Sequence, residues 1–402
     1  MDTKVRLTLK PQTLSHIIAQ ADRAGELMTG IKGAMLAPSA RKVSRTFNAS
    51  QVAALCGVDR SQITYRATKG DLPSGGHRGD DKSQSRREFT LAEARQWVRA
   101  YRASELRPAG AEAVVIAVAN FKGGVGKTTT AMALAQGLSL RGHKVLVIDC
   151  DPQGSLTTLF GILPDTEVDD EDTILPLCAG QETSIRPSIR STYWDGIDLV
   201  AAAPLLFGAE FALPSRQTSE ADFEFWSVLD VGLDDIRGEY DVIIIDTPPS
   251  LSYVTINALW ASNGMIMPLP PSALDVASAS QFWRLFSDLA SQLIQQRGVS
   301  KEFDFIRVLL TRVDSNDATT TVVREWIGQS YEGKVLPVEI PKTSAAASAA
   351  AEFGTVYDVA KYDGSAKTLK RALDAYERVT ELVEQLVQAT WHLHEVQSGK
   401  VA

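Results

Sequence analysis

A glycine-rich turn between a strand pattern and a helix pattern constrains the fold of this chain more than any other feature. Residues 114–119 form an apolar run typical of a buried strand, and residues 128–140 are predicted to form a helix. Between them, residues 122–129 read Lys-Gly-Gly-Val-Gly-Lys-Thr-Thr. Glycines followed by Gly-Lys-Thr, set between a strand and a helix, are the pattern of a phosphate-binding loop. The sequence therefore predicts a strand–loop–helix unit that holds the phosphates of a nucleoside triphosphate.

The residue types of this loop match that chemistry. Glycine lacks a Cβ atom, so backbone N–H groups can curl around phosphate oxygens, and the helix N-terminus adds partial positive charge. Lys127 is expected to reach the β- and γ-phosphates, and the Thr128 hydroxyl to bind Mg²⁺. The loop residues predicted to contact the nucleotide are Lys122, Gly123, Gly124, Val125, Gly126, Lys127, Thr128 and Thr129.

Two positions depart from the general pattern. Phe121 replaces the first glycine of the motif, and a second lysine, Lys122, follows it. A second cation can reach phosphate charge that Lys127 does not cover. If Lys122 points away from its own nucleotide, it can complete the site of a second subunit, as an activating cation supplied in trans does. We therefore predict that both lysines act in catalysis in a dimer-forming ATPase.

Two further predicted strands end in carboxylates. Residues 144–148 precede Asp149 and Asp151, and residues 242–245 precede Asp246. Ligands bind outside the carboxyl ends of the strands in open parallel sheets, so these acids are expected near the loop. Asp151 is predicted to orient or deprotonate the attacking water, or else to cap the next helix, and Asp246 to hold Mg²⁺. Thr-Pro-Pro at 247–249 would then be a switch loop that senses the γ-phosphate.

Apolar runs alternate with helical patterns through the rest of the chain. This alternation predicts an α/β fold with a doubly wound, mostly parallel sheet. Residues 161–190 are predicted to be mostly loop, and residues 366–394 one long helix. The other predicted strands are residues 197–201, 265–268, 306–310 and 335–340.

The first 40 residues are predicted to be a helical segment. Apolar residues repeat at heptad-like spacing over residues 12–36, which indicates a helix that packs against a second subunit or against its own chain. We expect dimerisation. The seam consists of Leu14, Ile17, Ala21, Ala24, Met28, Ile31 and Met35.

Residues 46–107 are predicted to form a winged helix-turn-helix domain. Ser50 is expected to cap a short helix at 51–56, and Asp59 to open a second one in a capping box with Gln62. A basic loop at 70–87 precedes a third helix, which begins with a capping box of Thr90 and Glu93 and runs to Tyr101. Residues 108–110 are predicted to be a linker to an ATPase domain at 111–402.

The charge of the chain is divided unevenly. Residues 1–110 hold 19 Lys and Arg against 10 Asp and Glu, a net of +9, whereas the total is −8, so the remainder carries −17. This division favours a polyanion partner for the N-terminal part. On the predicted second helix, side chains can read base edges, and those on the wing can contact phosphates. The predicted DNA-binding residues are Arg60, Ser61, Gln62, Thr64, Tyr65, Arg66, Arg78, Lys82, Arg86 and Arg87.

Three motifs in this order resemble the ParA/MinD group of ATPases with a deviant phosphate loop. They are Lys-Gly-Gly-Val-Gly-Lys-Thr-Thr at 122–129, Asp-Cys-Asp-Pro-Gln-Gly at 149–154 and Asp-Thr-Pro-Pro at 246–249. Met-Pro-Leu-Pro-Pro at 267–271 with Asp275 is similar to the ParA partition proteins. The upstream helix-turn-helix resembles the larger plasmid-type members, including RepA-like proteins of secondary replicons. The resemblance covers roughly residues 46–360.

The resemblance implies a DNA-partition ATPase that uses ATP, ADP and Mg²⁺. It implies an ATP-dependent homodimer that binds DNA without sequence preference, hydrolysis stimulated by a ParB-type centromere-binding protein, and operator binding by the N-terminal domain. A cytoplasmic, nucleoid-associated bacterial protein is expected. It further places four residues at the nucleotide base: Thr311, Arg312, Asp314 and Pro341. A loosely defined basic strip for DNA would include Arg312, Lys334, Lys342, Lys361, Lys367, Lys370 and Arg371.

Two alternatives remain open at the level of the sequence. One is an ATP-sensing transcriptional repressor, and the other a MinD-like membrane-cycling ATPase. The second needs a basic amphipathic tail, but residues 377–395 carry several glutamates and no apolar run reaches about 18 residues, so we expect no membrane partner. The three separated cysteines predict no zinc site or disulfide, and all five histidines are expected at the surface or at helix caps.

Overall fold

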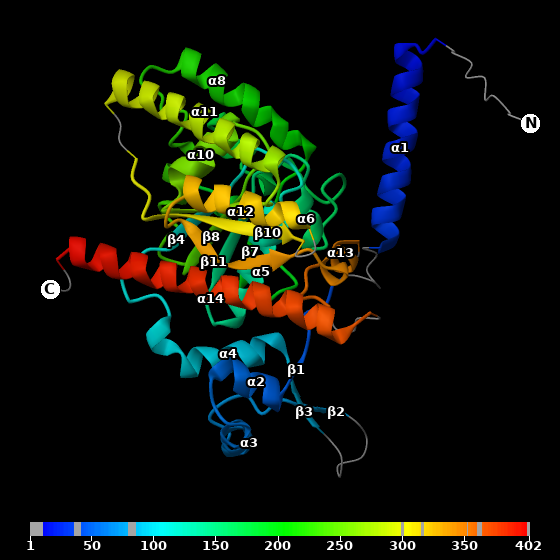
Figure 1. Cartoon of the computed structure of the whole chain (residues 1–402), viewed down its shortest axis with the longest axis vertical. Coiled ribbons are helices and arrows are strands. Elements are labelled where there is room, and N and C mark those ends of the chain that lie inside the picture. Colours follow the sequence, from blue (N-terminus) through cyan, green and yellow to red (C-terminus); the bar gives the residue numbers. More distant parts are fainter. Residues whose placement is uncertain are drawn as a thin grey trace, which may run out of the picture. The chain divides into compact units, whose positions relative to one another are not determined.

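The computed structural model describes residues 11–35, 42–78, 86–298, 301–314, 317–351, 353–359 and 364–399. The chain forms two compact units, Met1–Lys42 and Val43–Ala402. In the first unit, the predicted N-terminal helix is observed as α1 (Leu14–Met35) (Figure 1). Within that unit, its apolar side chains Leu14, Ile17 and Met28 are exposed.

An eight-stranded sheet forms the centre of the second unit. The strand order is β11-β10-β9-β4-β8-β5-β7-β6, and only the edge strand β6 is antiparallel to its neighbour. The doubly wound, mostly parallel fold predicted from the apolar runs is therefore confirmed. The strands are β4 (Val114–Val118), β5 (Val145–Asp149), β6 (Arg190–Ser191), β7 (Ile197–Val200), β8 (Val242–Asp246), β9 (Gly264–Leu269), β10 (Phe305–Val313) and β11 (Val335–Pro341).

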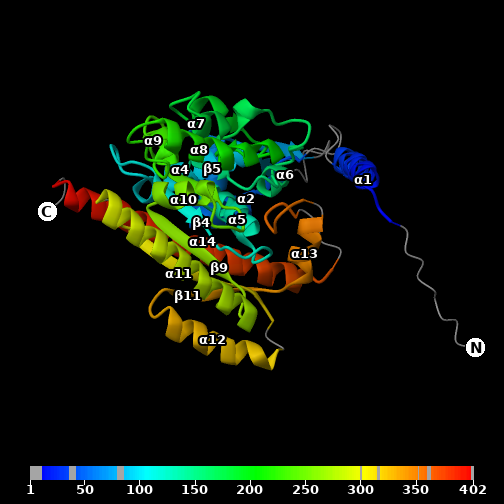
Figure 2. The same ribbon diagram turned by 90° about the horizontal axis from the view of Figure 1, so that it is seen from above.

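Helices cover both faces of this sheet, because alternate strand side chains point to opposite faces. On β4, Ile116 joins one apolar core and Val115 another. One face is covered by α5 and α14, and the other by α7 to α12, of which α7, α8 and α9 lie grouped in Figure 2. The helices are α5 (Lys127–Leu140), α6 (Ser155–Leu159), α7 (Leu175–Ala179), α8 (Ala209–Ser219), α9 (Val228–Leu233), α10 (Tyr253–Ala261), α11 (Ala273–Arg297), α12 (Ala318–Ser330), α13 (Ser344–Ala351) and α14 (Ala366–Gln397).

The start of the second unit is a small helical module with a three-stranded antiparallel sheet of order β1-β3-β2. The succession of helix, helix, hairpin and helix is that of a winged helix-turn-helix. Figure 1 shows α3 at the outer end of this module. Its elements are β1 (Phe47–Asn48), α2 (Ala49–Cys56), α3 (Arg60–Lys69), β2 (Gly76–Arg78), β3 (Arg86–Phe89) and α4 (Leu91–Tyr101).

The caps of these helices correct two predictions. The cap of α2 is Asn48 rather than Ser50, because the Asn48 side chain accepts from two backbone N–H groups while Gln51 bonds back to the Asn48 N–H. Asp59 caps α3 as predicted, but its carboxylate accepts from the Ser61 N–H (2.7 Å) and no box with Gln62 forms. The capping box of Thr90 and Glu93 on α4 is confirmed.

The predicted linker at 108–110 is an anchored turn. The Ala111 N–H donates to the Pro108 carbonyl at 3.1 Å, and the Arg107 guanidinium bonds Asp241 at 3.2 Å. The boundary between the predicted domains at 46–107 and 111–402 thus falls inside one compact unit. Among the described residues, no helix is long and apolar enough to cross a bilayer.

One histidine departs from its expected surface position. His143 is fully buried, and its Nε2 atom lies 2.7 Å from the Glu384 carboxylate. The prediction was wrong because His143 follows α5 and lies under α14, whose glutamate Glu384 turns inward. Glu384 is itself buried, although it belongs to a helix that carries several other glutamates.

Candidate functional site

The glycine-rich loop connects the end of β4 to the start of α5, as predicted. Gly124 and Gly126 adopt φ values of +74° and +97°, a region that residues with a Cβ atom rarely occupy. Gly126 is the N-cap of α5, and α5 begins at Lys127. The first N–H groups of a helix have no partner within the helix, so this end of α5 can bind an anion.

Lys127 folds back over the loop. Its side chain is buried, and its Nζ atom donates to the Lys122 carbonyl oxygen at 3.1 Å. Burial lowers the pKa of Lys127, while the nearby carboxylates of Asp246 and Asp151 oppose this shift. A positive charge that has lost part of its hydration is favourably placed to bind phosphate oxygens.

Asp246 ends β8 beside the loop and is fully buried. Neither of its carboxylate oxygens has a hydrogen-bond partner of normal geometry among the residues that the structure describes, although the Thr128 side chain lies close enough to oppose the rise of its pKa. Burial is the largest cause that raises the pKa of Asp246 well above its usual range, and the charge of Asp149 adds to it. The side chain of Thr128 and the positive charge of Lys127 act in the opposite direction and lower this pKa. An unpartnered buried carboxylate is costly, and a divalent cation would offset that cost, so Asp246 and the Thr128 hydroxyl fit a Mg²⁺ ion.

The other strand-end acids differ in their surroundings. Asp149 is fully buried and accepts from Thr157, at 2.9 Å from its N–H and 2.8 Å from its hydroxyl; burial raises the pKa of Asp149 to about 7. Asp151 is half-buried and accepts from the Gln153 N–H at 3.0 Å. Asp151 therefore supports its own turn, but it does not cap the next helix as the alternative interpretation expects, because the N-cap of α6 is Gly154, which has no side-chain cap hydrogen bond.

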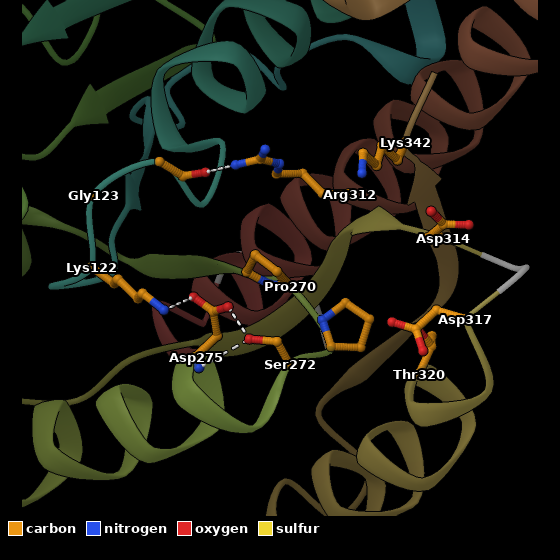
Figure 3. Close-up of a pocket in the computed structure, with 12 residues that line it drawn as sticks. Lys122, Gly123, Pro270, Ser272, Asp275, Arg312, Asp314, Asp317, Thr320 and Lys342 are labelled. Carbon is orange, nitrogen blue, oxygen red and sulfur yellow. Dashed lines mark hydrogen bonds and ion pairs between the residues drawn. The ribbon is translucent and has the colours of Figure 1, made fainter. Parts of the chain in front are cut away.

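Lys122 points away from its own loop. Its Nζ atom lies 2.7 Å from Asp275 near the start of α11, and the Ser272 hydroxyl also bonds that carboxylate (Figure 3). These side chains line a pocket of about 320 Å³. The lining residues are Lys122, Gly123, Gly124, Pro270, Pro271, Ser272, Asp275, Arg312, Asp314, Asp317, Thr320 and Lys342.

The residues predicted at the nucleotide base support the loop from the side of β10. The Thr311 hydroxyl donates to the Val125 carbonyl at 2.8 Å, and Arg312, at φ +53°, donates to the Gly124 carbonyl at 2.7 Å. Asp314 lines the same pocket as Arg312. Pro341 is buried at the end of β11, opposite Val313.

Sequence reasoning missed three residues that line this pocket: Ser272, Asp317 and Thr320. Asp317 caps α12 and Ser272 precedes α11, so both carry a helix-start signal that could have placed them. The predicted switch residue Thr247 is buried and donates to the Val118 carbonyl at 3.0 Å.

The predicted DNA-binding residues of α3 share one exposed surface. Arg60, Ser61, Gln62, Thr64 and Tyr65 are all exposed, and Tyr65 is 67% exposed. They alternate with two inward-facing residues of α3, Ile63 and Ala67, which are buried. This surface could enter a major groove.

Two predicted DNA-binding arginines instead have partners within the module. Arg66 is paired with Asp71 at 2.8 Å, and Arg87 donates to the Ser74 carbonyl (2.8 Å) and to Thr68 (3.2 Å). The backbones of Arg78 and Arg86 pair across the β2–β3 hairpin. Lys82 and, in the basic strip, Lys361 lie outside the described residues.

Comparisons with known proteins agree with this architecture. A family profile described as an AAA domain matches residues 113–297. A Sinorhizobium fredii protein that is provisionally named replication protein A is 32% identical over 93% of this chain and 94% of its own length. The chromosome partitioning protein ParA of Caulobacter vibrioides is 30% identical over 66% of this chain and 94% of its own length.

Solved structures extend the comparison. A structure described as a partition protein has a TM-score of 0.65 and covers 93% of this chain and 99% of its own; at 19% identity it shows the fold alone. Cobyrinic acid a,c-diamide synthase from Mycobacterium smegmatis, solved with bound ADP and magnesium, is 28% identical, has a TM-score of 0.51 and covers 71% of this chain and 96% of its own.

Proposed function

The chain belongs to the ParA family of partition ATPases, and we propose that it hydrolyses ATP to time its binding to DNA during plasmid or chromosome partition. The observation that carries the proposal is Asp246, a buried carboxylate without a hydrogen-bond partner among the described residues, at the mouth of a phosphate loop. A relative of known structure that binds ADP and magnesium supports the choice of ligands.

The loop residues have distinct roles in this proposal. Backbone N–H groups of residues 123–129 and the buried Lys127 bind the phosphates, while Thr128 and Asp246 hold Mg²⁺. Bound Mg²⁺ supplies positive charge against the phosphates. Asp151 positions the attacking water. We propose that Thr311, Arg312, Asp314 and Pro341 border the nucleotide base.

Lys122 connects hydrolysis to dimerisation in this proposal. In the structure it is held by Asp275 of its own chain (Figure 3). When a second subunit docks on this face, Lys122 exchanges Asp275 for a phosphate of the partner's nucleotide. This contact between two ATPase parts would then form only in the ATP state, independently of any contact made by the N-terminal helix.

The DNA-binding activities divide between two parts of the chain. The exposed face of α3 and the β2–β3 hairpin would bind an operator and repress the chain's own gene. The ATP dimer would bind DNA of any sequence through a basic strip, as a nucleoid-associated cytoplasmic protein. A ParB-type centromere-binding protein would stimulate hydrolysis and release the dimer from DNA.

An ATPase assay tests this proposal. We expect slow ATP turnover by the full chain, stimulated by duplex DNA together with the ParB-type protein encoded beside it. Asp151→Ala should lower turnover by about two orders of magnitude while ATP still binds, since a positioned base contributes that much. Exposed Asp288→Ala is the matched control.

The outcomes separate the alternatives. Turnover that neither DNA nor the partner stimulates argues against partition. If Asp151→Ala leaves plasmid retention intact while nucleotide still controls operator binding, the chain is an ATP-sensing repressor. Nucleotide-dependent binding to anionic vesicles would instead support the membrane-cycling alternative.

A further inference from the structure

Helix α5 has a second functional end, opposite the phosphate loop. The last carbonyl groups of any helix have no partner within it and carry partial negative charge. At the end of α5, guanidinium groups from α4 of the helix-turn-helix module and from its C-cap bind carbonyls of the last turn and of the residues directly after it. The buried Arg95 donates to the carbonyls of Ser139 at 2.9 Å and His143 at 2.8 Å.

A second arginine of α4 and the arginine at its C-cap complete this arrangement. Arg99 donates to the Gly142 carbonyl, and Arg102, which directly follows α4, donates to the Arg141 carbonyl at 3.2 Å. Positions 95, 99 and 102 are spaced four and three residues apart, so their side chains lie on one helix face. We call Arg95, Arg99 and Arg102 the guanidinium cap.

Two glycines of the ATPase part lie against the guanidinium cap. Gly196 has φ +80°, and a Cβ atom there would overlap the guanidinium of Arg95. Gly142 has φ +97°, and its Cβ would lie 3.2 Å from the Arg99 side chain. At both positions, the absence of a Cβ atom on the glycine therefore leaves space for an arginine side chain.

Acidic side chains hold the cap in place. The buried Arg95 is paired with Asp195, which is itself exposed, and Arg102 is paired with the buried Glu384 of α14 at 2.9 Å. Glu384 also contacts His143, which follows α5. Removing one member of such a buried cluster leaves its partners unpaired, so the arrangement favours a single position of α4 on α5.

On its other side, α4 is joined to the proposed DNA-binding surface. Trp97 packs edge-on against Phe89 of β3 and donates to the Pro73 carbonyl at 3.0 Å. Tyr101 stacks on Trp97, and the Arg66 guanidinium of α3 lies 5.2 Å from the Tyr101 ring centre. A continuous set of contacts thus runs from the end of α5 to α3.

We propose that the guanidinium cap couples the phosphate loop to the helix-turn-helix module, so that nucleotide bound at one end of α5 changes the stability of α4 and α3 at the other. Helix α5 has 14 residues, about 20 Å, and almost all are buried, so it acts as one rigid element. The inference rests on the proposed nucleotide binding at the loop and assigns Arg95, Arg99 and Arg102 as positioning residues.

Hydrogen exchange of the full chain tests this coupling, with and without ADP and Mg²⁺. In the unaltered protein, nucleotide should slow exchange in residues 122–129 and also, by about tenfold, in α4. In the double variant R99A/R102A, slowing should persist at 122–129 and fall below about twofold in α4. Arg99 is at the exposed edge of the contact, whereas Arg102 is paired with the buried Glu384, so R99A alone is the second variant and should show the same direction of change if the double variant does not fold. R378A removes an exposed arginine of α14 that is paired with Glu381; it is the control and should behave as the unaltered protein.

The difference between the two nucleotide conditions is the readout, because a merely structural role of the cap would raise exchange in α4 equally in both. If nucleotide slows hydrogen exchange at 122–129 but not in α4 of the unaltered protein, the proposed coupling is wrong, while the ATPase proposal stands. Slowing in α4 that survives in R99A/R102A also overturns the coupling. If nucleotide slows exchange nowhere, the proposed function fails, and the coupling with it.

Discussion

At the scale of single residues, the site contains ionisable side chains that are buried away from solvent. Lys127 of the phosphate loop is buried, and so are Asp149 and Asp246 at the ends of the neighbouring strands. Burial is the largest cause of the pKa shift of each of these groups. Such groups destabilise the folded chain until a ligand compensates for their lost hydration. A site of this kind is expected to gain stability when nucleotide and metal bind.

Replacing Asp246 by asparagine should therefore stabilise the chain in the absence of nucleotide, by about 1–2 kcal/mol near pH 8. The pKa of Asp246 is raised in the folded state, so the folded chain binds more protons than the unfolded chain above the ordinary aspartate pKa. Stability then falls as the pH rises through this window, and the asparagine variant escapes that loss. Urea unfolding at several pH values measures it.

The gain should shrink towards about pH 5, where the folded carboxyl keeps its proton. The same variant should lose the added stability that Mg²⁺ and ADP give the unaltered protein. Asp288→Asn, at an exposed position of α11, should show neither effect. A gain that is equal at all pH values would contradict a buried, titrating Asp246.

At the scale of elements, α3 carries exposed side chains without a described ion pair beside an arginine, Arg66, that already has a partner within the module. Arg60 and Gln62 are exposed, while Arg66 is already bonded to Asp71 and lies over Tyr101. A side chain that must first leave its partner contributes less to a new contact. The arginines of α3 are therefore not equivalent, although the sequence presents them alike.

Arg60→Ala should weaken binding to a duplex from upstream of the chain's own gene by about tenfold, since a lost base or phosphate contact costs about 1–3 kcal/mol. Arg66→Ala should weaken it less and mainly lower the stability of the module. Fluorescence anisotropy at fixed salt measures the first, and thermal unfolding the second. Equal losses for both variants would show that Arg66 leaves Asp71 to bind DNA.

The contact of α4 with α5 gives a second prediction at this scale. Gly196→Ala should lower the free energy of unfolding by about 1–3 kcal/mol, because the new Cβ atom displaces the buried Arg95 and the residue has positive φ. Gly238→Ala is the control, because nothing lies within 4 Å of its Cβ position. It should change stability by less than about 0.5 kcal/mol in the same chemical unfolding experiment.

At the scale of the whole molecule, the chain divides near the end of the predicted N-terminal helical segment and not at the predicted linker at 108–110. Met1–Lys42 is one compact unit and Val43–Ala402 the other. Within its own unit, α1 presents exposed Leu14, Ile18 and Leu27. An exposed apolar helix of this length is rarely stable alone, which favours a partner helix from a second subunit.

Deleting residues 1–42 should leave the remaining unit folded and reduce self-association. The melting temperature should change by less than about 2 °C, because the core of the second unit lies wholly within residues 43–402. Light scattering without nucleotide should show a dimer for the full chain and a monomer for the shortened one. A dimer in both cases would place the nucleotide-independent contact elsewhere.

The sequence by itself determined the local units. The loop at 122–129, the strands that end in Asp149 and Asp246, the start of α4 at Thr90 and the length of α14 follow from backbone sterics, capping and apolar periodicity. These forces act between residues a few positions apart, so a pattern in the sequence is enough to reveal them.

Only the tertiary structure decided which distant groups meet. Lys122 forms an ion pair with Asp275, and Arg95 donates to a backbone carbonyl in the last turn of α5. His143 bonds Glu384 although 241 positions separate them. Each of these contacts joins groups that lie far apart in the sequence, and from the sequence alone His143 is expected at the surface. The burial of Arg95, His143 and Glu384 became favourable only because folding brought a partner of opposite charge, or a helix end with free carbonyls, within hydrogen-bond distance.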